Sequence, residues 1–295
     1  MIFPSRQQIH AAVRVALDED TALGDVTTAA LFPTSCVARA MLVARQHAVV
    51  AGITVVRDTF LAVDPTLRIT RAVHEGTPVR DGVSLLQVTG DARSLLMAER
   101  VALNFLQRLS GIATLTAQFC HAVRGYRAKI FDTRKTTPGL RLLEKWAVRI
   151  GGGHNHRQNL SDAILIKDNH LSLLRATGGS VADACRLARE RAPHGLRIIV
   201  EVDRVAQVRD AVEGNADVIL LDNMTPDEVR HAIDLIKGQA LVEVSGGITL
   251  GNVREMAAAG ADFISIGALT HSAPAVDISM ELEPLRRKPS RRQKP

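Results

Sequence analysis

From about Lys129 onward, short apolar runs alternate with amphipathic stretches along the chain. The runs predict strands at Lys129–Thr133, Ala163–Lys167, Arg197–Val202, Asp217–Leu221, Ala240–Val244 and Asp262–Ile266. Apolar residues at helical spacing predict helices over Leu140–Ile150, Val181–Ala192, Arg204–Glu213, Pro226–Lys237 and Leu250–Ala259. Several of the strands are apolar on both faces, and this alternation indicates a parallel sheet that helices cover.

The residues at the ends of the predicted strands distinguish a barrel from an open sheet. Polar or small residues stand there each time, namely Arg134 with Lys135, Lys167, Glu201, Asp222, Ser245 and Gly267. Such residues converge on one mouth in a parallel barrel, whereas a doubly wound sheet distributes them on both sides of a switch point. The fold class that we expect is α/β, with an incomplete, open TIM-like barrel.

The N-terminal part of the chain does not follow this rhythm. Val37–Val50 and Leu67–Val73 predict strands of a mixed sheet, and Ala92–Val123 predicts a long helix interrupted near Ser110 and Gly111. We expect an N-terminal α+β sandwich domain over 1–112, onto which 275–285 packs back, and a barrel domain over 113–274. The remainder, 286–295, is expected to be a disordered basic tail.

The net charge of +6 belongs to this tail, because residues 286–295 hold six Lys and Arg and no acid. Without these six, the basic residues equal the 31 acidic ones, so the body of the chain is neutral. Aromatic residues make up only 3% of the chain, which argues against platforms for stacking nucleic-acid bases. We therefore expect a solvated terminus and no nucleic-acid partner, with a nucleic-acid-binding protein that uses the tail as an alternative.

Cysteine usage and hydropathy indicate a compartment. The three cysteines lie far apart and outside any CxxC pattern, which argues against a disulfide framework or a zinc knuckle and fits a reducing environment. The first twenty residues lack the apolar core of a secretory signal, and no apolar run reaches about 18 residues. We expect a soluble, cytoplasmic protein without a membrane partner.

Two constellations suit phosphate and metal chemistry. Ser245-Gly246-Gly247 and Gly267-Ala268 each follow a late strand and precede a helix, where exposed backbone N–H groups can hold a phosphate. Glu201 and Asp222 end neighbouring strands, and two carboxylates at one mouth can hold Mg²⁺, which commonly arrives with substrate phosphates. Two alternatives stay open: one acid pairs with a nearby lysine, or the two acids hydrolyse a glycoside.

The segment from Phe131 to His170 gathers cations around the triglycine Gly151–Gly153. The cations that we single out are Arg134, Lys135, His156, Arg157 and Lys167. Guanidinium forks bind carboxylates bidentately, and a lysine supplies a point charge for carboxylate or phosphate. The set indicates a pocket for a small, highly charged anion. The alternative is a metal-dependent barrel hydrolase that uses His154, His156 and His170, which so many cations disfavour.

Several motifs together resemble the quinolinate phosphoribosyltransferase family. They are DTRKTTPGLRLLEKWAV, GGGHNHRQNLSDAILIKDNH, EVSGGI and ISIGALTHS, with EDTALGDVTT and MAERVALNFLQRLSGIAT nearer the N-terminus. The resemblance covers nearly the whole chain apart from the basic tail. It implies phosphoribosyl transfer from phosphoribosyl pyrophosphate to quinolinate with decarboxylation, in NAD biosynthesis and with Mg²⁺. A paralogous molybdenum-transport-type phosphoribosyltransferase-like protein with a different acceptor is the alternative.

The same resemblance implies roles for individual residues and an assembly. It implies a homodimer with shared active sites, in which Arg100 of the MAER run reaches the quinolinate site of the other subunit; higher oligomers stay open. Quinolinate would also contact Arg134, His156, Arg157 and Lys167. The catalytic residues would be Lys135, Glu201 and Asp222, with the two acids holding the metal. Phosphoribosyl pyrophosphate would be bound by Lys135, Ser245, Gly246, Gly247, Gly267, Ala268 and His271.

Overall fold

The computed structural model describes residues 3–32 and 34–285 and divides the chain into two compact units. Unit 1 comprises Met1–Thr114, Leu142–Gly151 and Ala273–Pro295, and unit 2 comprises Leu115–Arg141 and Gly152–Ser272. The segment Leu142–Gly151 therefore groups with unit 1, although it lies inside the barrel domain that we predicted over 113–274. The predicted basic tail, 286–295, lies outside the described residues.

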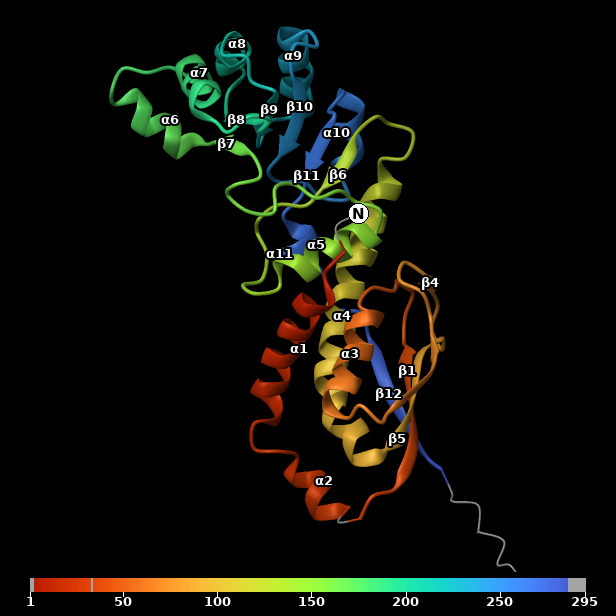
Figure 1. Cartoon of the computed structure of the whole chain (residues 1–295). Coiled ribbons are helices and arrows are strands. Elements are labelled where there is room, and N and C mark those ends of the chain that lie inside the picture. Colours follow the sequence, from red (N-terminus) through yellow and green to blue (C-terminus); the bar gives the residue numbers. More distant parts are fainter. Residues whose placement is uncertain (1–2, 33, 286–295) are drawn as a thin grey trace, which may run out of the picture. The chain divides into compact units, whose positions relative to one another are not determined.

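Unit 1 contains a four-stranded antiparallel sheet in the order β12-β1-β5-β3 (Figure 1). Its strands are β1 (Val37–Ala44), β3 (Arg68–Ala72), β5 (Ser84–Asp91) and β12 (Ile278–Pro284). The short strands β2 (Ala48–Val49) and β4 (Pro78–Val79) form a second, two-stranded sheet. All pairs are antiparallel, so the expected mixed sheet was wrong. The predicted run Val37–Val50 is divided between β1 and β2.

The helices of this part of the chain are α1 (Arg6–Thr21), α2 (Val26–Leu31), α3 (Ile53–Val63), α4 (Ala92–Ala122) and α5 (Arg141–Ile150). Helices α3 and α4 share an apolar core with the sheet, and α1 packs against α3. One apolar core joins Leu42 of β1, Phe60 of α3 and Leu95 of α4, each fully buried. The sequence analysis did not predict α1, α2 or α3.

Helix α4 runs through the position where we predicted an interruption. The Ser110 hydroxyl is buried. It accepts a hydrogen bond from the N–H of Ala51 at 3.1 Å and donates one to the carbonyl of the same residue at 3.2 Å. A Cβ atom on Gly111 would lie 2.1 Å from the carbonyl oxygen of Pro274. Both residues therefore serve close packing of other segments against an intact helix, and the predicted interruption was wrong.

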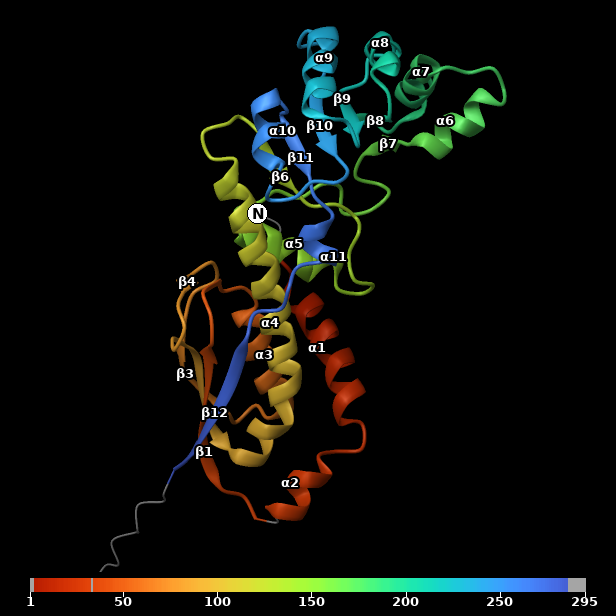
Figure 2. The same ribbon diagram turned by 180° about the vertical axis from the view of Figure 1, so that it is seen from behind.

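Unit 2 is built on a six-stranded parallel sheet in the order β6-β11-β10-β9-β8-β7 (Figures 1 and 2). Its strands are β6 (Lys129–Phe131), β7 (Ile164–Ile166), β8 (Ile198–Val202), β9 (Val218–Asp222), β10 (Leu241–Ser245) and β11 (Phe263–Ser265). Each overlaps one predicted run. The order is sequential from β7 to β11, and β6, the first strand of the unit, pairs with β11, the last. A parallel bridge between Phe131 and His154 adds one more segment beside β6.

Helices follow the strands of unit 2 along the chain, and all but the last, α11, lie between two strands of this sheet. They are α6 (Asp168–Arg175), α7 (Val181–Arg191), α8 (Val208–Glu213), α9 (Pro226–Ile236), α10 (Val253–Ala259) and α11 (Ala268–His271). A 3₁₀ turn, Val205–Gln207, precedes α8, and the short helices α6 and α11 were not predicted. A small apolar cluster of Ile199, Val218 and Leu220 lies along the sheet. In the described part of the chain, no helix has the length and apolar character to cross a membrane.

Candidate functional site

A cavity of about 690 Å³ lies at the carboxyl ends of the parallel strands of unit 2. It is lined by every predicted site residue of this unit: Arg134, Lys135, His156, Arg157, Lys167, Glu201, Asp222, Ser245, Gly246, Gly247, Gly267, Ala268 and His271. The remaining predicted residue, Arg100, is exposed on α4 of unit 1. The topology thus brings together residues that are far apart in the sequence, because each follows or ends a strand of one parallel sheet.

Two segments that place the arginines are fastened side by side. The N–H of His154 donates to the carbonyl of Ile130 at 2.8 Å, and the N–H of Asp132 donates to the carbonyl of His154 at 3.1 Å. The fully buried carboxylate of Asp132 accepts from the N–H of His156 at 2.8 Å and from the amide of Asn155 at 2.6 Å. These contacts fix the backbone on which His156 and its neighbour Arg157 stand.

The two arginines of the cavity influence each other electrostatically. Burial lowers the pKa of Arg157, and the positive charge of Arg134 lowers it further, while Asp162 opposes this shift. Arg157 donates to the carbonyl of Ala163 at 3.3 Å. The Nε atom of Arg134 is buried and has no hydrogen-bond partner in the described part of the chain. A buried donor next to a second guanidinium is costly unless an anion accepts from it.

The predicted acids lie at the ends of adjacent strands. Glu201 of β8 accepts a hydrogen bond from the ammonium group of Lys167 at 2.9 Å. This contact is the acid–lysine pair that the sequence analysis left open as an alternative. Asp222 of β9 accepts from the side-chain amide of Asn223 at 2.7 Å. Mg²⁺ binds to one or two carboxylates when substrate oxygens and water complete its shell, so this pair of oxygen donors fits the ion.

The glycine loops require glycine for different reasons. Gly246 and Gly247 have φ angles of 88° and 62°, in the left-handed region that favours glycine. A Cβ on Gly246 would also lie 2.3 Å from the side chain of Asn223. At Gly267, a Cβ would lie 3.0 Å from Nε2 of His271 and 3.0 Å from Cδ of Lys135. Two backbone loops and two basic side chains therefore meet at this side of the cavity.

The three histidines of the alternative metal site lie in different environments. The ring of His154 stacks on Phe131 with 5.3 Å between the ring centroids. Nδ1 of His170 accepts a hydrogen bond from the N–H of Lys167 at 2.9 Å. His156 lines the cavity. Within residues 3–32 and 34–285, no group of three or more His, Cys, Asp or Glu could hold a metal ion.

Residues that the sequence analysis did not single out also line the cavity, above all Glu243 and Ser265. The run that contains Glu243 is otherwise apolar, and we treated it as a strand buried on both faces. Side chains alternate along a strand. Glu243 stands two positions before Ser245 and thus shares its face of the sheet. This spacing was the signal that could have identified it.

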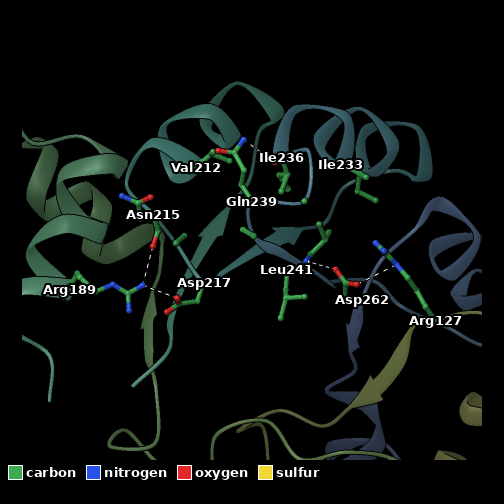
Figure 3. A pocket seen from close by; sticks show the side chains of 14 residues that line it. Arg127, Arg189, Val212, Asn215, Asp217, Ile233, Ile236, Gln239, Leu241 and Asp262 are labelled. Atoms are coloured by element: carbon green, nitrogen blue, oxygen red, sulfur yellow. Dashed lines mark hydrogen bonds and ion pairs between the residues drawn. The ribbon is translucent and has the colours of Figure 1, made fainter. Parts of the chain in front are cut away.

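A second cavity, of about 660 Å³, lies at the opposite, amino-terminal ends of the strands (Figure 3). Its charged residues are paired: Arg189 lies 2.8 Å from Asp217, and Arg127 lies 3.3 Å from Asp262. Asp217 also accepts from the N–H of Ile198 at 2.6 Å. The first pair connects α7 with the start of β9, and the second connects the starts of β6 and β11. Because the charges of both pairs are already balanced, this cavity is a weaker candidate for an anion site.

Comparisons with known proteins identify relatives along almost the whole chain. The family model for the quinolinate phosphoribosyl transferase N-terminal domain matches residues 25–110, and that for the C-terminal domain matches residues 112–281. The probable nicotinate-nucleotide pyrophosphorylase [carboxylating] of Bacillus subtilis is 43% identical over 265 residues, which are 90% of this chain and 90% of that protein. The nicotinate-nucleotide pyrophosphorylase [carboxylating] of Mycobacterium leprae is 43% identical, over 92% of this chain and 95% of its own length.

Solved structures agree with these relatives. NadC from Streptococcus pyogenes superposes with a TM-score of 0.90 at 42% identity, covering 97% of this chain and 100% of that one. The human nicotinic acid phosphoribosyltransferase superposes with a TM-score of 0.55 at 16% identity, covering 95% of this chain and 74% of that one, and shows a likeness of fold only.

Proposed function

Because the chain belongs to the quinolinate phosphoribosyltransferase family, we propose that the cavity of unit 2 is its active site. The enzyme is a pentosyltransferase, a carboxylating nicotinate-nucleotide pyrophosphorylase. Its reaction converts quinolinate and phosphoribosyl pyrophosphate into nicotinate mononucleotide, pyrophosphate and CO₂. Both substrates are small and highly anionic, as the cationic lining of the cavity requires.

The observation that carries this proposal is the arrangement of Arg134 and Arg157. Two guanidinium groups close enough to lower a pKa, one with a buried unpartnered Nε, favour an anion with more than one negative charge. Quinolinate has two neighbouring carboxylates and meets this requirement. Lys167 and His156 line the same cavity and would complete its contacts.

Phosphoribosyl pyrophosphate would occupy the part of the cavity that the glycine loops line. Backbone N–H groups around Gly246, Gly247 and Gly267 can hold the 5′-phosphate. Lys135 and the ring of His271 lie against Gly267, and Lys135 adds positive charge there. Ser245 and Ala268 line the same part of the cavity.

Mg²⁺ would be held by Glu201 and Asp222, whose carboxylates are suitable hard oxygen ligands. When bound, the ion would neutralise part of the charge on the pyrophosphate group. Lys167 would then have to share Glu201, to which it donates a hydrogen bond. Lys135 supplies further positive charge in the same cavity.

The chemistry needs positioning rather than a protein nucleophile. The pyridine nitrogen of quinolinate attacks C1 of the ribose, and the C–O bond to pyrophosphate breaks with both electrons leaving on the oxygen. The nitrogen thereby becomes cationic and stabilises the carbanion that remains when the adjacent carboxylate departs as CO₂. A proton from solvent water then bonds to this ring carbon and completes nicotinate mononucleotide. Arg134 and Arg157 would orient the ring by its carboxylates, and Lys135 would stabilise charge on the leaving group.

We also propose finer features that the family resemblance implies. The sheet of unit 2 would be an incomplete, open TIM-like barrel, supported by the pairing of β6 with β11 and the position of β7 at the other edge. The protein would act as a homodimer in the cytoplasm, and Arg100 would reach the quinolinate site of the second subunit. The exposure of Arg100 on α4 is compatible with such a role.

The deciding experiment supplies the purified chain with phosphoribosyl pyrophosphate, Mg²⁺ and either quinolinate or nicotinate. We expect nicotinate mononucleotide and stoichiometric CO₂ from quinolinate and no product from nicotinate. Omission of Mg²⁺ together with chelation should abolish the reaction. A folded protein that forms no product from quinolinate would contradict the proposed function and favour a paralogue with another acceptor.

A further inference from the structure

A buried carboxylate lies at the cavity and has no role in the proposal above. Glu243 stands in the middle of β10, and only 2% of the residue is exposed. In the register of the sheet it lies beside Leu220 of β9 and Phe263 of β11. A carboxylate in such an apolar setting is costly unless hydrogen bonds compensate it.

Two polar groups face this carboxylate. The hydroxyl of the buried Ser265 donates a hydrogen bond to Oε1 of Glu243. The same oxygen lies 3.4 Å from Nε2 of His156, whose side chain is 11% exposed. The carboxylate therefore connects β10 and β11 with the segment that follows the glycine turn.

The other ring nitrogen of His156 indicates where the proton of the neutral ring lies. Nδ1 accepts a hydrogen bond from the N–H of Arg157 at 2.8 Å, so it carries no proton in that arrangement. The proton of the neutral imidazole then lies on Nε2, the nitrogen that faces Glu243. The ring is thus oriented at both nitrogens, and Asp132 holds the backbone N–H of the same residue.

His156, Arg157 and Glu243 also line a smaller cavity of about 160 Å³ beside the main one. These three residues form the wall that the two cavities share. A change in the ring of His156 would displace the hydrogen bond to the N–H of Arg157, and with it a guanidinium of the anion pocket.

We propose that Glu243, held by Ser265, is the positioning residue of the quinolinate pocket. It orients the imidazole of His156, keeps its proton on Nε2 and through this ring fixes the backbone of Arg157. The inference rests on the proposed function, since that function assigns His156 and Arg157 to the quinolinate pocket. Glu243 acts through its neighbours and has no contact with the reacting atoms in this assignment.

The test is Glu243→Gln, which keeps the shape and removes the charge. We expect the KM for quinolinate to rise about tenfold or more, as for loss of a charged hydrogen bond, while the KM for phosphoribosyl pyrophosphate stays within about twofold. Ser265→Ala keeps the carboxylate but loosens it, and should raise the KM for quinolinate by a smaller factor. Glu255→Gln, on the exposed face of α10, is the matched control.

A second readout does not depend on turnover. ¹⁵N NMR of histidine-labelled protein, with His156 assigned by its absence from His156→Gln, should show a proton on Nε2 in the unchanged chain and an altered tautomer or shift in Glu243→Gln. Equal rises in both KM values, or unchanged KM values with an unchanged His156 signal in a folded variant, would overturn the inference. Absence of activity in the unchanged chain would refute the proposed function, and the NMR result would still decide the role of Glu243.

Discussion

At the scale of single residues, the anion pocket depends on two like charges that the fold holds together. Each guanidinium alone resembles an ordinary surface arginine in sequence. Within the folded chain, the charge of Arg134 lowers the pKa of Arg157, and Nε of Arg134 is buried without a partner among the described residues. The free enzyme thus bears a cost that binding of a dicarboxylate would remove.

Replacement of Arg134 by alanine should raise the KM for quinolinate by about tenfold to a hundredfold, since a hydrogen bond to a charged group contributes about 1.5–3 kcal/mol. The KM for phosphoribosyl pyrophosphate should change little, because this substrate is proposed to bind to the glycine loops and not to Arg134. Steady-state kinetics with each substrate varied in turn would check this. Arg204→Ala, at an exposed position outside the cavity, is the control. An unchanged KM for quinolinate would remove Arg134 from the binding site.

The sequence predicted the charged lining of this cavity well, for a physical reason. Charges at strand ends stand out against apolar strands, and a parallel sheet places all those ends at one edge. Glu243 escaped notice because it lies inside a strand, where a carboxylate has to be explained by tertiary contacts with Ser265 and His156. The two-residue spacing to Ser245 places Glu243 on the cavity face of the sheet, but local sequence does not show which partners it meets there.

At the scale of secondary-structure elements, strands were easier to predict than helix continuity. The six strands of unit 2 overlap the short apolar runs of the sequence, whereas the close packing that Gly111 permits along α4 depends on a segment far away in the sequence. Gly111 breaks the helical pattern in sequence. In the fold, Gly111 leaves room for the carbonyl oxygen of Pro274, because a Cβ atom on residue 111 would lie only 2.1 Å from that oxygen.

Gly111→Ala should therefore destabilise the protein by about 1–3 kcal/mol through overpacking, although alanine is the better helix former by about 1 kcal/mol. Denaturant-induced unfolding would measure the difference. Asn104→Ala at an exposed position of the same helix should be neutral or stabilising. If Gly111→Ala were as stable as that control, the glycine would not be needed for close approach.

The ends of the strands opposite the active site are joined by a repeated pairing (Figure 3). Asp262 accepts from the N–H of Val242 at 2.9 Å and pairs with Arg127 at 3.3 Å. Asp262→Ala should cost about 1–3 kcal/mol of unfolding free energy, because it leaves a strand N–H without its acceptor. Arg127→Ala should cost less, since 60% of that side chain is exposed and the pair is screened. Thermal unfolding together with kcat would check that only stability changes; a lower kcat at full folding would indicate a functional role for this face.

The start of α3 carries a pH-sensitive contact. Glu75 accepts hydrogen bonds from the N–H groups of Gly52 at 2.8 Å and Thr54 at 3.0 Å, yet burial raises its pKa above the ordinary 4.5. Just above pH 4.5, Glu75 therefore binds more protons in the folded chain than in the unfolded chain. The contribution of Glu75 to the free energy of unfolding consequently falls as the pH rises from 4.5 through the raised pKa.

Glu75→Gln should flatten the dependence of unfolding free energy on pH in this range, even if the variant is less stable overall. Denaturant titrations at a series of pH values would measure the slope. Glu19→Gln, at an exposed position of α1, should keep the original slope. The same slope in both variants would show that Glu75 does not titrate as its burial implies.

At the scale of the whole molecule, the proposed shared site can be tested by mixing subunits. Arg100→Ala and Asp222→Ala should each lose most activity when purified alone. If Arg100 serves the neighbouring subunit, refolding or exchange of the two variants together should restore about a quarter of the unchanged activity, because half of random dimers carry one intact site of two. Mixtures that remain as inactive as the separate variants would place Arg100 outside the partner's site.

The order of strands in unit 1 has a consequence for synthesis of the chain on the ribosome. Strand β1 pairs with β5 on one side and with β12 on the other. Roughly 190 residues lie between β5 and β12, which corresponds to about 10 s or more of translation. During this interval one edge of β1 has no partner strand and could pair with another nascent chain. Messages truncated before Ile278 should consequently yield aggregation-prone products, even though every residue of the active-site cavity has already been made.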